Sequence, residues 1–149
     1  MSVRITRRQF LEISASAFIL NPLAAGCGRS RFTPQSVIRD LEANETIGKL
    51  REGKITFNYQ EIVSENGKEA IFIIHRGLIA LDLLPHIPEC EYGVYGPKTT
   101  EATRRLQVWA GIDTVQGNNG KRFDQATLFA LEKALQQKID DRWIPPKNF

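Results

Sequence analysis

Apolar residues recur at helical spacing in two segments of the C-terminal third of the chain. The first segment opens at Gly96-Pro97, where a proline at the first helical position sacrifices no intrahelical hydrogen bond, and it stops at Gly111. The second opens at Asp124, a residue type that favours helix N-caps, and runs to about Ile139. The stripes expected to be buried are Thr99, Ala102, Leu106 and Trp109 in the first helix and Leu128, Leu131, Leu135 and Ile139 in the second.

The pattern is less decisive before Pro85. Thr33-Pro34 predicts a short helix to about Ala43. Residues 54–63 alternate apolar and polar positions as a strand does, and a turn signal, Asn66-Gly67, follows them. These features predict secondary structure ahead of the two C-terminal helices.

Residues 69–84 fit two structures. Asn66 and Glu69 have the spacing of a capping box, which favours a helix, whereas the β-branched residues 70–74 would also suit a strand paired with residues 54–63. We expect a helix over at least residues 77–84, ended by Pro85, and leave residues 70–75 open. The sequence therefore predicts a mainly α fold, with a small β-hairpin N-terminal to the helices as an option.

The first 26 residues have the order of an export signal: a basic start, an apolar stretch and small residues at the end. Thr6-Arg7-Arg8-Gln9-Phe10-Leu11 resembles the twin-arginine motif, with Glu12 where that motif usually has lysine. Polar residues dilute the apolar stretch, which makes it a poor membrane span, because about 20 predominantly apolar residues are needed to cross a bilayer as a helix. We therefore expect residues 1–26 to be a signal peptide and the protein to act outside the cytoplasm.

The signal ends at Cys27. Ala-Gly-Cys after small apolar residues resembles a lipobox, in which Cys27 would be acylated and become the first residue of the mature chain. The alternative is an ordinary cleavage site near Ala25 or Gly26, which would leave a thiol able to pair with Cys90. A membrane-anchored protein, in the periplasm or on the outer face of the cytoplasmic membrane, is the favoured outcome, with residues 27–35 as the tether.

Charge argues against a nucleic-acid partner. The net charge of the whole chain is +3, and removing residues 1–26, with three arginines and one glutamate, leaves +1. A surface so near neutrality has no strong field to steer phosphates. The densest basic group left, Arg29 and Arg31, is close to the proposed anchor and could contact anionic lipid headgroups.

An internal repeat links the two C-terminal helices. An aromatic residue, a cap, a threonine and an alanine recur in one register, 28 residues apart. The aromatic can pack back onto its helix, the threonine can satisfy free backbone N–H groups, and the alanine lets helices approach closely. The matched pairs are Tyr95 and Phe123, Gly96 and Asp124, Thr99 and Thr127, and Ala102 and Ala130.

Residues 92–112 resemble the small peptidoglycan-binding domain that is appended to many bacterial wall enzymes. That family has an Asp-Gly-x-aromatic-Gly-x-x-Thr-x-x-Ala pattern and a second Gly-x-x-Thr-x-x-Ala-Leu half, here residues 124–131. Tyr92 replaces the usual aspartate, and Asp124 replaces the second glycine. The resemblance implies a compact three-helix bundle over residues 69–149 that holds cell-wall polymer without cleaving it, preceded by an extension over residues 36–68.

Four side chains are candidates for binding the wall polymer. Tyr92 and Tyr95 flank glycines and could stack on sugars, although Tyr95 could equally be the packing aromatic of the repeat. Arg104 and Arg105 could pair with the carboxylates of peptide stems. The alternative for these arginines is a solvated helix face on which Glu101 pairs with Arg105.

No enzyme motif stands out, and we expect no catalytic residues, cofactor or metal. His75, His86 and Cys90 lack the spacing of a metal hydrolase, and residues 113–124 lack the ligands of an EF-hand. The leading hypothesis is a noncatalytic envelope protein that binds peptidoglycan. The alternatives are a module that binds a protein partner in the envelope and, third, a small metal-dependent wall hydrolase.

Overall fold

The computed structural model describes residues 32–112 and 119–147. The chain divides into two units, Met1–Arg31 and Phe32–Phe149, and every described residue belongs to the second. The predictions on Arg7, Arg8 and Cys27 therefore lie outside the described residues. Within the described residues, no helix has the length and apolar character needed to cross a membrane.

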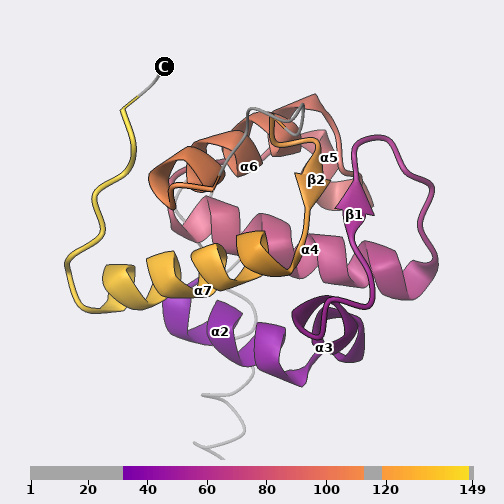
Figure 1. The fold of residues 1–149 in the computed structure, drawn as a ribbon, viewed down its shortest axis with the longest axis horizontal. Coiled ribbons are helices and arrows are strands. Elements are labelled where there is room, and N and C mark those ends of the chain that lie inside the picture. Colours follow the sequence, from indigo (N-terminus) through magenta and orange to yellow (C-terminus); the bar gives the residue numbers. More distant parts are fainter. Residues whose placement is uncertain (1–31, 113–118, 148–149) are drawn as a thin grey trace, which may run out of the picture. The chain divides into compact units, whose positions relative to one another are not determined.

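The described part of the chain is mainly helical and has one small antiparallel sheet (Figure 1). This confirms the expectation of a mainly α fold. The elements are α2 (Pro34–Ala43), α3 (Glu45–Arg51), β1 (Phe57–Asn58), α4 (Glu65–Ala80), α5 (Pro88–Tyr92), α6 (Pro97–Trp109), β2 (Arg122–Phe123) and α7 (Gln125–Ile139).

Helix α4 forms the centre of the core. Ile71, Ile74 and Leu78 are fully or almost fully buried, and α2, α5, α6 and α7 all pack against this helix (Figure 1). A helix that is apolar on most sides is stable only when other elements cover it. Residues 70–75, which the sequence leaves open between strand and helix, are helical for this reason, because burial on several sides outweighs the β-propensity of their isoleucines.

The β-hairpin that the sequence leaves as an option does not form. β1 pairs with β2, which comes much later in the chain, with Phe57 opposite Phe123 and Asn58 opposite Arg122. No hairpin forms between residues 54–63 and 70–74, because the second segment lies inside α4. The sheet therefore joins the N-terminal part of the unit to the start of α7.

The expected boundaries of α4 also need correction. Ser64 caps this helix by accepting a hydrogen bond from the Gly67 N–H, so Asn66-Gly67 belongs to its first turn and forms no separate turn. The helix ends at Ala80, before Pro85, because Asp82 has a left-handed φ of 59°. The other predicted helices agree closely with α2, α6 and α7, including the caps Thr33 and Asp124.

Residues 36–68 share the core of the rest of the unit. Val37, Leu41, Ile47 and Leu50 are fully buried, and they form one cluster with the buried residues of α4, α6 and α7. The unit Phe32–Phe149 therefore has a hydrophobic core of its own, which is what a chain segment needs to fold independently.

Candidate functional site

A groove of about 800 Å³ lies where α2, α3, α4 and α5 meet. Its α4 side is a single helical face, because the lining residues of α4 are spaced three or four positions apart. The lining residues are Asp40 and Ala43 from α2, Asn44 and Glu45 at the start of α3, Glu65, Lys68, Glu69, Phe72, Ile73 and Arg76 from α4, and Glu91 and Tyr92 from α5.

The groove is acidic. Five of its lining residues are carboxylates and only two are cations, and both cations already have carboxylate partners. The Arg76 guanidinium is 3.3 Å from Asp40, and the Lys68 ammonium is 2.8 Å from Glu65. Phe72 and Ile73 add apolar surface between these charged groups.

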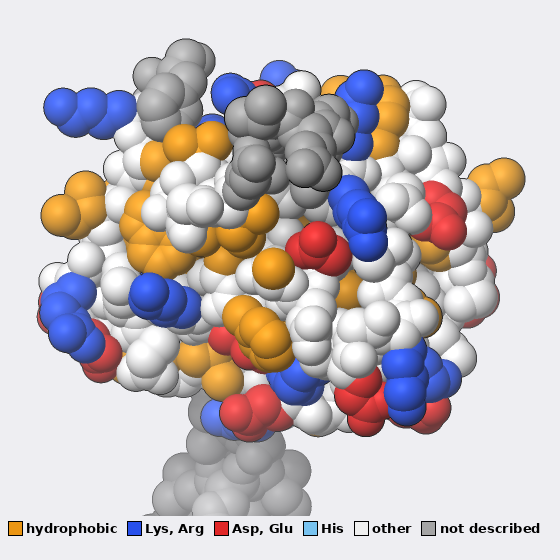
Figure 2. Space-filling model, viewed as in Figure 1, with side chains coloured by type: hydrophobic (Ala, Val, Ile, Leu, Met, Phe, Trp, Pro, Cys, Tyr) orange, Lys and Arg blue, Asp and Glu red, His pale blue; other side chains and the backbone are white. Residues whose placement is uncertain are grey.

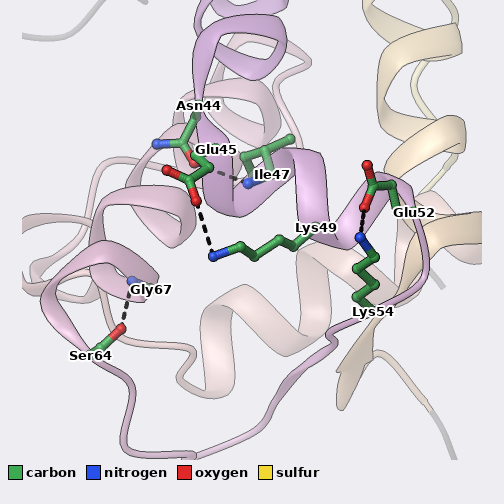
Figure 3. A network of polar contacts seen from close by, with 8 residues as sticks. All are labelled: Asn44, Glu45, Ile47, Lys49, Glu52, Lys54, Ser64 and Gly67. Carbon is green, nitrogen blue, oxygen red and sulfur yellow. Dashed lines mark hydrogen bonds and ion pairs between the residues drawn. The ribbon is translucent and has the colours of Figure 1, made fainter.

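Two of the carboxylates have a structural explanation. Glu45 and Glu65 lie in the first turns of α3 and α4, where a negative charge is favourable because the N-terminal end of a helix is electropositive. Figure 3 shows Asn44 and Ser64 capping these two helices, and the Glu45 carboxylate pointing toward Lys49. The two charged groups are 3.1 Å apart.

The other two carboxylates, Glu69 and Glu91, have no lysine or arginine partner among the described residues, although Glu91 also lies in the first turn of a helix, α5. Glu69 is exposed and has no ion-pair or hydrogen-bond partner within residues 32–112 and 119–147. Glu91 has His86 at 3.5 Å, and both of these side chains are more than half exposed. The negative charge at Glu69 and Glu91 is therefore available to a ligand.

Tyr92 is placed at the edge of the groove by a close contact between α5 and α4. Gly93 follows it with a left-handed φ of 60°, and a Cβ at this position would lie 2.8 Å from the Lys68 carbonyl oxygen. Only glycine permits both the backbone conformation and the approach. Tyr92 itself is 67% exposed, so it keeps an aromatic surface free for stacking.

Tyr95, the second stacking candidate, is a core residue. It is 1% exposed, and its hydroxyl donates a 2.6 Å hydrogen bond to the Gly120 carbonyl. Burial raises the pKa of Tyr95. This placement favours the alternative named above, in which Tyr95 is the packing aromatic of the repeat.

The two arginine candidates are occupied by contacts within the protein, and neither lines the groove. Arg104 makes a bidentate pair with Glu101, at 2.9 and 3.2 Å, and the expected pairing of Glu101 with Arg105 is wrong. Arg105 lies partly buried and donates a 3.1 Å hydrogen bond to the Pro146 carbonyl. Of the four candidates, the structure thus places only Tyr92 in the groove.

The tail after α7 packs back on the helices. Trp143 donates a hydrogen bond to the Leu81 carbonyl at 3.1 Å, and its ring meets that of Trp109 edge-on, with 5.0 Å between the centroids. Figure 2 shows apolar side chains gathered where this tail passes the C-terminal end of α6. The apolar surface on this side therefore serves to hold the tail in place.

A buried polar cluster connects α4, α5 and α6. Thr99 donates its hydroxyl hydrogen to Glu89 at 2.9 Å, and His75 Nε2 is 2.9 Å from the same hydroxyl oxygen. The hydroxyl has one hydrogen, so His75 must donate to it through Nε2–H. Desolvation lowers the pKa of His75 to about 4, although the nearby Glu89 charge and the Val94 carbonyl act in the opposite direction.

The histidines and Cys90 do not converge on one point. His75 and Cys90 are buried, whereas the His86 side chain is 68% exposed. Among the residues that the structure describes, no group of three or more His, Cys, Asp or Glu side chains could hold a metal ion. Cys90 is a free thiol, and burial raises its pKa.

Four groove residues, Asp40, Glu69, Phe72 and Arg76, were not predicted from the sequence as site residues. A signal was present, because three of them lie on one face if residues 65–76 are helical, but residues 70–75 were left open between helix and strand.

Comparisons with models of protein families, with curated proteins and with solved structures found no match to this chain.

Proposed function

We propose that this protein is a noncatalytic component of the cell envelope that binds peptidoglycan. In this proposal, α4, α6 and α7 are the three helices of a peptidoglycan-binding bundle. The proposal continues the resemblance carried by residues 92–112 and 124–131, and α2 and α3 would be additions that cover α4 and α7.

The observation that carries the proposal is the 28-residue repeat, whose matched residues have matched environments. Tyr95 and Phe123 are both buried before their helices, at 1% and 0% exposure. Thr99 and Thr127 are both fully buried in the first turns of α6 and α7. The equivalent alanines, Ala102 and Ala130, are buried as well.

The helix starts are matched in their chemistry too. Asp124 accepts hydrogen bonds from the N–H and the hydroxyl of Thr127, at 3.0 and 2.9 Å. Glu89 accepts the equivalent two bonds from Thr99, also at 3.0 and 2.9 Å. Such agreement in detail is expected if α6 and α7 are two halves of one motif, and it supports the resemblance on which the function rests.

The surface proposed for the wall polymer surrounds Tyr92. The loop after β1 lies against the segment before α6, because the Gln60 N–H donates to the Tyr95 carbonyl at 3.1 Å. This loop and this segment expose Ile62, at 98%, and Val94, at 44%, in addition to Tyr92. An exposed aromatic ring with apolar neighbours suits the faces of sugar rings.

Export and anchoring complete the proposal. The twin-arginine-like segment with Arg7 and Arg8 would direct export, and a lipid on Cys27 would hold the protein at the membrane. The domain would then reach the wall from the end of a short tether.

The proposal is tested by incubating residues 28–149 with purified sacculi and measuring the fraction that sediments with them. Tyr92→Ala should lower the retained fraction several-fold. Phe129→Ala is the matched control, because Phe129 is an aromatic that is 47% exposed on α7, a helix that contributes no lining residue to the groove at Tyr92. The metal content of the same sample tests the hydrolase alternative. Absence of sedimentation, or an equal loss in both variants, would refute the proposal.

A further inference from the structure

The groove has the charge and shape to hold a positively charged chain. Glu69 on α4 and Glu91 on α5 both line it and offer carboxylates that are not engaged by a lysine or arginine among the described residues. A lysine or arginine side chain that reached either carboxylate would gain a charge-assisted contact. The lining of the groove holds no cation that is free to compete for these carboxylates, since Lys68 and Arg76 already pair with Glu65 and Asp40.

The surface beside these carboxylates is apolar. Phe72 is partly buried and Ile73 is 6% exposed, and both line the groove. Lysine and arginine carry long aliphatic stems that cover such surface while their charged ends reach polar groups. Tyr92 at the edge adds a ring face on which a cation can lie.

We propose that this groove is a docking site for a basic segment of another protein, with lysine or arginine side chains reaching Glu69 and Glu91. The stems would lie over Phe72 and Ile73. The groove shares Tyr92 with the surface proposed for the wall polymer, and the two proposals differ in the use they make of Glu69 and Glu91. The peptide stems of the wall carry carboxylates of their own, which a lining of five carboxylates and two cations would repel.

The experiment measures binding of a fluorescent peptide to residues 28–149 by anisotropy. The probe is about ten residues long and alternates lysine with alanine, so that successive lysines of an extended chain point to one side. The same peptide with glutamate in place of lysine is the negative control. Binding of the lysine peptide should weaken markedly between about 50 and 300 mM NaCl.

Paired substitutions locate the binding. Glu69→Gln with Glu91→Gln should weaken the lysine peptide about tenfold, because both carboxylates proposed to contact its lysines are lost. Asp82→Asn with Glu101→Gln removes the same charge from exposed positions outside the groove, and should change affinity less than about twofold. Circular dichroism checks that both variants are folded.

Three outcomes would overturn the inference. The two peptides would bind equally, or the control pair would lose as much affinity as the groove pair. Alternatively, the groove pair would lose sedimentation with sacculi while keeping the peptide, which would assign the groove to the wall polymer. If the Glu69→Gln, Glu91→Gln variant loses peptide binding and still sediments normally with sacculi, the docking site is supported. The wall proposal then depends on its own test with Tyr92→Ala.

Discussion

The Glu89 carboxylate caps α6 through Thr99, from a different helix. Its Oε2 atom accepts hydrogen bonds from the Thr99 N–H and hydroxyl, and Oε1 accepts one from the Lys98 N–H at 3.1 Å. The N-cap residue, Gly96, has no side chain to do this, and a Cβ there would lie 2.3 Å from the Glu89 Cδ atom. The Glu89 carboxylate therefore joins α5 to α6 by hydrogen bonds at the N-terminal end of α6, which is electropositive and favours a negative charge.

Removing this cap should destabilise the fold. We expect Glu89→Ala to lower the free energy of unfolding by about 2 kcal/mol, since it leaves buried donors of α6 without an acceptor. Gly96→Ala should cost about 1 to 3 kcal/mol, because its Cβ would displace the carboxylate. Urea unfolding of both single variants and the double variant measures their coupling. Additive losses would show that Gly96 does not serve to admit Glu89.

His75 should make stability depend on pH. Its pKa is about 4 in the folded protein against its usual 6.5, so below pH 6.5 the unfolded chain takes up a proton that the folded protein does not. The free energy of unfolding should therefore fall as pH drops from 6.5 to about 4, by about 3 kcal/mol if this group acts alone. The stabilising contribution is fully present above pH 6.5.

The measurement is the urea midpoint at several pH values across this window. His75→Gln should flatten the dependence, even though it lowers stability at neutral pH through altered packing. His86→Gln is the control, because the His86 side chain is 68% exposed. An unchanged slope in the His75 variant would mean that other groups govern the acid sensitivity.

The sequence predicts most completely the helices whose caps and stripes are local. α2, α6 and α7 agree with their expected bounds because Thr33, Pro97 and Asp124 mark the starts within the segments themselves. The partner of β1 could not be predicted in this way, since the pairing of Phe57 with Phe123 depends on how distant elements pack. Propensity also failed over residues 70–75, where burial by neighbouring helices decides the structure.

The candidate site was less predictable than the fold. Tyr92 was named from its glycine neighbours, and it is exposed at the groove. Glu69 could have been found from the helical face that it shares with Phe72 and Arg76. Glu91 gave no local signal, because an isolated glutamate looks like any solvated residue until the helices that carry it are assembled. Glu89 was missed as a cap for a similar reason, since it lies on α5 and serves α6.

Leu131 fills the space that Gly77 leaves between α4 and α7. A Cβ at Gly77 would lie 3.1 Å from both methyl groups of Leu131, which is fully buried. Leu131→Ala, like Leu106→Ala, should cost about 2 to 5 kcal/mol. Gly77→Ala should be more favourable in the Leu131→Ala background than in the natural chain by about 1 kcal/mol, because the methyl group then has room. Equal effects in both backgrounds would contradict this packing.

The last prediction concerns Cys27, which lies outside the described residues and which we propose carries the lipid anchor. Cys27→Ala should move the protein from the membrane fraction to the soluble fraction, because the proposed lipid is attached to the Cys27 sulfur and would be lost with it. Cys90→Ala is the matched control. Cys90 is 3% exposed, so its loss should affect packing and leave fractionation unchanged. If the Cys27 variant stayed with the membrane, the anchor would have to be sought elsewhere, and the periplasmic tether proposed for residues 27–35 would lose its basis.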